Sequence, residues 1–134
     1  GARARLREVD AGRPVRLRLS AEPRMDLSGR WEFSFDRTLN GQLAPTTVPY
    51  ELILISLDES RFVARFVFPG DDPSRFEGAL FTSERGALFS LHQRNEKTGY
   101  HALYVGRVES PTLLSGIFID VAGPAGDVRL RKIP

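Results

Sequence analysis

Apolar and polar residues alternate in short runs along most of the chain, which is the pattern of half-buried β-strands. From residue 28 onward we interpret eight such runs as strands, each bounded by glycine, proline or short polar segments. No stretch of helical length carries an apolar stripe with the helical period. The chain is therefore predicted to be all-β. The predicted strands are residues 28–36, 49–57, 60–68, 75–83, 86–94, 99–107, 112–121 and 126–133.

The connections between these strands are predicted to be hairpins. Residues 57–60 and 83–86 are short enough for tight turns, and residues 95–98 form a four-residue loop. Short hairpins place successive strands side by side and antiparallel. A long meander with one apolar face removes its exposed edges by closing on itself. We therefore predict that residues 25–134 form one eight-stranded antiparallel up-and-down β-barrel.

Residues 1–24 differ from the rest of the chain in their basic character. They contain seven Arg and three acidic residues. Residues 15–19 alternate apolar and charged side chains, as a strand does. This segment is interpreted as an Arg-rich arm or linker, either from an upstream domain or in contact with an acidic partner.

Turn positions also predict which side chains face the barrel interior, because cross-strand partners in a hairpin share a face. A tight turn at residues 84–85 pairs Leu80 with Phe89, and a loop centred on residues 96–97 pairs Phe89 with Tyr104. The face selected in this way is aromatic, with glycines and a few polar groups, and we take it as the interior. The residues expected to bind a ligand there are Phe33, Phe89, Gln93, Tyr100, Tyr104, Phe118 and Asp120.

The opposite face of the same strands is unusually apolar for the outside of a solitary barrel. Such a patch indicates a partner surface, in an oligomer or against another domain. A register slip of one residue would exchange the two faces. The residues expected at this interface are Phe81, Leu88, Leu103, Val105, Ile117 and Ile119.

The first barrel strand opens with Asp-Leu-Ser-Gly-Arg-Trp at residues 26–31. This opening resembles the Gly-x-Trp start of calycins, a superfamily that includes lipocalins, fatty-acid-binding proteins and avidins. The resemblance implies that Gly29 and Trp31 close one end of the barrel under an Arg of the last strand, here Arg129 or Arg131. Stacking of a guanidinium on an indole is worth ~0.5–2 kcal/mol. The chain has one Trp, whereas avidins resemble one another in several pocket Trp residues, so biotin binding is not expected.

Candidate catalytic and metal-binding chemistry is sparse. Cysteine is absent, which excludes disulfides and thiol chemistry. The predicted register puts His92 and His101 directly opposite each other, yet no third ligand is evident, so we interpret them as surface histidines. Asp71 and Asp72 fit a turn better than a calcium loop.

Asp120 is expected to be held by Tyr100 or an Arg. We predict no enzyme activity, no metal and no cofactor.

Charge and hydropathy limit the kinds of partner that the sequence predicts. A formal net charge of +2 does not favour nucleic acid as a partner, and no apolar run is long enough to span a membrane. The sequence therefore predicts a non-catalytic barrel that binds a small apolar or amphipathic ligand. The alternative is an interaction or oligomerisation module of a larger bacterial protein, with no ligand in the barrel.

Overall fold

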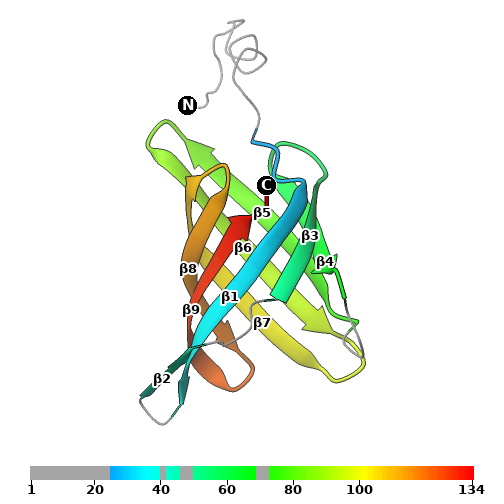
Figure 1. The fold of residues 1–134 in the computed structure, drawn as a ribbon, viewed down its shortest axis with the longest axis vertical. Coiled ribbons are helices and arrows are strands. Elements are labelled where there is room, and N and C mark those ends of the chain that lie inside the picture. Colours follow the sequence, from blue (N-terminus) through cyan, green and yellow to red (C-terminus); the bar gives the residue numbers. More distant parts are fainter. Residues whose placement is uncertain (1–24, 40–41, 46–49, 69–72) are drawn as a thin grey trace, which may run out of the picture.

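The computed structural model describes residues 25–39, 42–45, 50–68 and 73–134, and all of its regular elements are strands (Figure 1). The strands form one antiparallel sheet in the order β2-β1-β3-β4-β5-β6-β7-β8-β9. An additional pairing of β1 with β9 closes the sheet into a barrel. The strands are β1 (Gly29–Leu39), β2 (Gln42–Pro45), β3 (Tyr50–Ser56), β4 (Arg61–Phe66), β5 (Arg75–Ser83), β6 (Gly86–Asn95), β7 (Tyr100–Ser110), β8 (Leu113–Asp120) and β9 (Gly123–Lys132).

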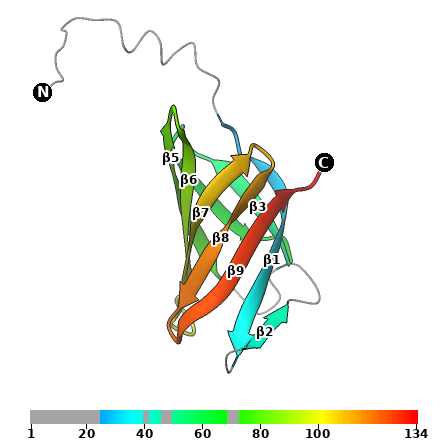
Figure 2. The ribbon, with the colours of Figure 1, turned by 90° about the vertical axis from the view of Figure 1, so that its left-hand side faces the viewer.

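The predicted eight-stranded up-and-down barrel is confirmed, and its wall consists of β1 and β3 to β9. The short strand β2 was not predicted. It pairs only with the end of β1, from Asp36 to Leu39, and lies beside the barrel wall (Figure 2). The Arg-rich arm proposed for residues 1–24 lies outside the described residues.

Alternation along the strands sorts the side chains as predicted. In β5, for example, Phe76, Gly78 and Leu80 are buried, while the intervening Glu77 is exposed. The same alternation on β6, β7 and β8 buries one face and exposes the other. The aromatic face is therefore the interior, and the exchange of faces by a one-residue slip does not occur.

The register agrees with the sequence prediction in one hairpin and differs in the next. Leu80 pairs with Phe89 across β5 and β6, as predicted. Between β6 and β7, however, Tyr104 pairs with Leu91 rather than with Phe89, a displacement of two residues. A shift of two leaves every side chain on its predicted face, because the side-chain period of a strand is two.

The loop between β6 and β7 explains this displacement. The Asn95 side-chain Oδ1 accepts hydrogen bonds from the amides of Lys97 and Thr98, at 3.0 and 3.1 Å. The amide of Gly99 donates to the Asn95 carbonyl at 2.7 Å, and Gly99 has a φ of 78°. That left-handed conformation favours glycine. Gly99 thus belongs to the loop, and β7 begins at Tyr100, one residue later than predicted.

Two glycines let β7 and β8 approach closely inside the barrel wall. Gly106 and Gly116 are direct cross-strand partners. A Cβ atom added to Gly106 would lie 2.0 Å from the Ser115 carbonyl oxygen, and one added to Gly116 would lie 2.0 Å from the Val105 carbonyl oxygen. Both clashes are with backbone, which cannot move aside as a side chain can.

We therefore predict that Gly106→Ala destabilises the barrel by about 2–3 kcal/mol, because overpacking has to displace a neighbouring strand. Urea unfolding followed by Trp31 fluorescence measures the change in the free energy of unfolding. Ser90→Ala, on the outer side of β6, is the control and should change stability much less. Equal stability of the two variants would contradict the close-approach argument.

The turn between β3 and β4 is organised by one carboxylate. Asp58 accepts hydrogen bonds from the amides of Ser60 and Arg61, at 2.9 and 2.8 Å, and forms an ion pair with the Arg61 guanidinium. The amide of Ser60 and the Arg61 side chain lower the pKa of Asp58 from 3.8 to about 2. Because the folded pKa lies below the unfolded value, the resulting stabilisation is present above pH 4 and is lost as the pH falls towards 2.

Asp58→Asn should remove this pH-dependent component. The difference in melting temperature between wild type and variant should be largest above about pH 5 and should shrink as the pH falls through 4 to 2. Thermal unfolding by circular dichroism across that range measures it. Glu59→Gln, which removes the same charge from the same turn, serves as the matched control. A wild-type-to-variant difference that is constant with pH would refute the role of the Asp58 carboxylate.

Candidate functional site

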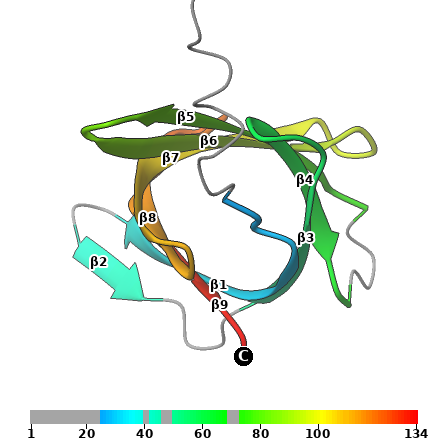
Figure 3. The ribbon, with the colours of Figure 1, turned by 90° about the horizontal axis from the view of Figure 1, so that it is seen from above.

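One end of the barrel is closed by the segment that precedes β1. Seen from this end, the segment from Met25 to Ser28 lies inside the ring of strands (Figure 3). Leu27 and Trp31 are fully buried, and the Trp31 Nε1 donates to the Leu27 carbonyl at 2.7 Å. The Leu27 amide donates to Ser56 Oγ, which ties the plug to β3. Gly29 and Trp31 thus lie at the closed end.

The cation over this end is not the one that the sequence suggested. Arg129 and Arg131 are exposed on the outer face of β9, so the expected stacking of an Arg on Trp31 is wrong. Alternation along β9 places Val128 and Leu130 inside and both Arg side chains outside. Lys132 follows the inward set: it pairs with Trp31, and its Cε would lie 3.0 Å from a Cβ added to Gly29.

The middle of the interior is filled by aromatic rings that meet across the barrel. Phe33 of β1 lies 6.2 Å from Phe76 of β5 and 5.3 Å from Tyr104 of β7, both in edge-to-face arrangements. Tyr104 also stacks on Phe118 of β8, with ring centroids 5.4 Å apart. Phe89 lies nearer the closed end, opposite Leu80. Three of the predicted interior residues, Phe33, Tyr104 and Phe118, therefore form one cluster.

The predicted polar residues of the interior form two hydrogen-bonded groups. Tyr104 donates through its hydroxyl to Gln93 Oε1 at 2.6 Å, and Gln93 Nε2 donates to Ser74 Oγ at 3.1 Å. Tyr100 donates to Asp120 Oδ2 at 3.1 Å, which is the contact expected for Asp120. Both groups lie towards the end of the barrel away from Trp31. Their roles in ligand binding stay predictions.

That second end carries aromatic side chains that the sequence prediction of a ligand site left out. Phe35 stacks on Tyr50, with ring centroids 6.0 Å apart and planes within 5°. Tyr50 also contacts Phe66, and Phe35 contacts Phe118. Tyr50 is 49% exposed, so the aromatic cluster reaches the surface here. The sequence could have predicted this cluster. Tyr50 is two residues before the inward-facing Leu52 on β3, and Phe66 of β4 is the cross-strand partner of Leu52, so all three share the inner face.

The outer apolar face comprises six side chains on strands β5 to β8, and all six are between 40% and 59% exposed. Val105 pairs with Ile117 and Leu103 pairs with Ile119, so these four form a compact centre. Phe81 and Leu88 are also direct partners and lie towards the β5–β6 turn. The structure therefore places the predicted interface residues on one outer surface. They are Phe81, Leu88, Leu103, Val105, Ile117 and Ile119.

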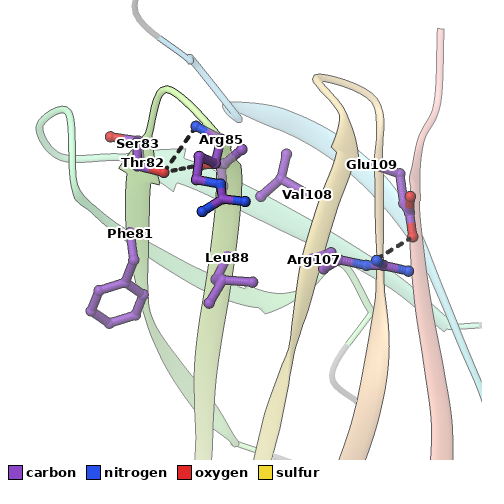
Figure 4. Close-up of a pocket in the computed structure, with 10 residues that line it drawn as sticks. Phe81, Thr82, Ser83, Arg85, Leu88, Arg107, Val108 and Glu109 are labelled. Atoms are coloured by element: carbon purple, nitrogen blue, oxygen red, sulfur yellow. Dashed lines mark hydrogen bonds and ion pairs between the residues drawn. The ribbon is translucent and has the colours of Figure 1, made fainter.

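An open groove of about 600 Å³ adjoins this face, between the β5–β6 hairpin and β7 (Figure 4). Phe81 and Leu88 contribute apolar walls, and Arg85 and Arg107 contribute charge. Glu109 accepts a hydrogen bond from Ser115 Oγ at 2.6 Å and lies 3.9 Å from the Arg107 Nε. The groove extends the outer apolar face with a predominantly basic rim.

His92 and His101 lie on the outer surface of β6 and β7. The corrected register pairs His92 with Leu103 and His101 with Arg94, so the two histidines are diagonal neighbours rather than direct partners. Their ring planes are nevertheless within 16° of each other, with centroids 5.2 Å apart, and His92 Nε2 and His101 Nδ1 share a hydrogen bond of 2.9 Å. Within the described residues, no group of three or more His, Cys, Asp or Glu side chains is arranged to hold a metal ion.

Comparisons with known proteins support the fold. The structure resembles that of a redesigned β-barrel, with a TM-score of 0.56 and 12% identity over 81% of this chain and 92% of that one. It also resembles a de novo designed fluorescence-activating β-barrel, with a TM-score of 0.52 and 19% identity over 79% of this chain and 93% of that one. At these identities the likeness establishes a closed antiparallel barrel and nothing more specific.

No protein-family model matches the chain, and no curated protein matches it. The class of the molecule is therefore defined by its architecture: a closed, eight-stranded antiparallel β-barrel. In the part of the chain that the structure describes, no helix is long and apolar enough to cross a bilayer.

Proposed function

We propose that this chain is a non-catalytic binding barrel and that its principal contact is self-association through the outer apolar face. The observation that carries the proposal is the exposure of six large apolar side chains on four adjacent strands. A contiguous surface of this kind is typical of a protein–protein interface. Closure of the barrel leaves the long strands without free edges, so such an interface has to form through side chains.

Both ends of this face carry charges of both signs, so neither end repels the same face of a second copy of the chain. Towards the β5–β6 turn lie Glu84, Arg85, Arg107 and Glu109, two positive and two negative groups. The other end likewise mixes both signs, with Arg75, Arg94 and Lys97 beside Glu77 and Glu96.

A two-fold axis lying in the plane of the face, near Val105 and Ile117, would lay this face of one copy on the same face of the other. Two-fold interfaces use the same patch on both subunits, so one patch has to be complementary to itself. An apolar centre with a charged rim also matches the usual anatomy of an interface. The outer apolar face meets both requirements.

We expect the wild-type chain to form a concentration-dependent dimer and Val105→Glu to be monomeric, because each copy in a dimer would bury an unpaired carboxylate. Sedimentation velocity over a range of concentrations measures the mass. Ile55→Glu is the matched control, since Ile55 is 47% exposed but lies on β3, away from this face. The control should dimerise like wild type. A monomeric wild-type chain, or a dimer that survives Val105→Glu, would refute the proposal.

A second candidate function is the binding of a small amphipathic ligand at the end of the barrel away from Trp31, which is called the mouth below. It is favoured by one observation: the stacked pair of Phe35 and Tyr50 extends the buried aromatic cluster to the surface. Because ring contacts fill the middle of the interior, the ligand would lie at this mouth against the two rings. A flat aromatic molecule with one polar group suits such a surface.

This second function predicts binding of an aromatic probe such as anilinonaphthalene sulfonate at the mouth. At 100 times its dissociation constant a ligand adds ~2.7 kcal/mol, which raises the melting temperature by several degrees. Tyr50→Ala should reduce the shift strongly. Val105→Glu separates the two sites, because it disrupts the outer apolar face and leaves the mouth intact. Loss of the shift in Val105→Glu but not in Tyr50→Ala would assign the probe to the outer face and reject a mouth site.

The calycin relationship also stays a proposal. It is supported by the placement of Gly29 and Trp31 at the closed end and by the plug that precedes β1. In this chain the last strand would contribute Lys132 in place of the Arg that the resemblance implied.

A further inference from the structure

The two histidines on the outer wall lie at the border of the outer apolar face. His92 of β6 is the direct cross-strand partner of Leu103 of β7, and Leu103 pairs in turn with Ile119 of β8. His101 precedes Leu103 by two residues, so it lies on the same outer side of β7. The amide of Val121, whose side chain is 67% exposed, donates to the His101 carbonyl at 3.1 Å. The histidine pair therefore borders a row of exposed apolar side chains.

The two imidazoles form a head-on hydrogen bond that is sensitive to added protons. His92 Nε2 and His101 Nδ1 are 2.9 Å apart, so one of these nitrogens carries the shared proton and the other accepts it. While both rings are neutral, the bond forms and the pair carries no charge. A first added proton leaves the bond in place and makes the pair a cation, and a second removes the acceptor and breaks the bond. Protonation therefore places charge at the border of the apolar face.

The charged groups around the pair do not neutralise such a cation. Glu77 of β5 and Arg94 of β6 are the cross-strand partners of the two histidines, and their side chains lie 3.6 Å apart. On β8 and in the turn after it, the exposed residues beside the pair are the uncharged Ile119 and Val121. The charged residues of β5, β6 and the β6–β7 loop at this end are Arg75, Arg94, Lys97, Glu77 and Glu96. Three positive and two negative groups leave a net charge of +1, and a proton added to the pair raises it to +2.

We propose, on the basis of the self-association proposed above, that this histidine pair makes dimer formation depend on pH. The dimer is favoured while the pair is neutral and is weakened once the pair is protonated. Imidazole is the side chain whose charge ordinarily changes between pH 5 and 8. Association removes water from the border of the face, and burying a charge without a counter-charge is costly. Acidification therefore favours the free copies, in which water still hydrates the protonated pair.

Sedimentation velocity of the full chain at pH 7 and at pH 5.5 tests this dependence, because the chain contains two His and these ordinarily titrate in that interval. An imidazole with a pKa of about 6.5 that takes up one proton in each of two free copies raises the dissociation constant about 70-fold over this interval. We expect that rise for wild type. The double variant His92→Gln/His101→Gln should dimerise at pH 7 and keep the same dissociation constant at pH 5.5. Arg129→Gln, exposed on β9, is the control and should show the wild-type rise.

Circular dichroism melting at both pH values checks that the variants remain folded. A wild-type dissociation constant that is equal at pH 7 and pH 5.5, or a rise that persists in the double variant, would overturn the role of the histidines and leave self-association intact. A wild-type chain that is monomeric at both pH values would refute self-association itself and, with it, the dependence on pH.

Discussion

Pairing of the first barrel strand with the last is the constraint on which the rest of this structure depends. Seven residue pairs, from Trp31 with Lys132 to Arg37 with Gly126, join β1 to β9. An open sheet of this length would present two long unpaired edges. Closure removes them and at the same time gives each residue an inside or an outside position. The plug at Leu27 and the aromatic cluster at Phe33 are both attached to β1, so both depend on that junction.

The inner and outer faces of the barrel wall have different compositions. The interior is a packed assembly of rings whose few polar groups, such as Gln93 and Asp120, have hydrogen-bond partners. Such a core stabilises the barrel, so the small ligand proposed above would lie at the end of the barrel away from Trp31. The exterior of β5 to β8 combines apolar side chains, a basic groove and the histidine pair on one wall. That wall is therefore the surface on which the proposed self-association depends.

Much of this architecture was predictable because two local signals agree along the chain. Turn residues predicted the number of barrel strands, and period-two alternation predicted which face of each strand is buried. Because that period is two, the two-residue register error at β6–β7 left every predicted face correct. The strand β2 was not predicted, because its four residues are too few to show a clear alternation of apolar and polar side chains. The roles of Lys132 and Tyr50, and the 2.9 Å histidine contact, depend on three-dimensional geometry that spacing along the chain does not contain.

The same closure has a consequence for how the protein is made. Synthesis proceeds from the N-terminus, and β1 leaves the ribosome long before β9 exists to pair with it. Until about residue 123 has emerged, the nascent sheet keeps an unpaired edge and an exposed aromatic face. Contacts between such distant segments also form slowly. We therefore expect the yield of folded barrel to depend on chaperones that bind the chain during translation. A stalled or truncated chain should aggregate rather than fold.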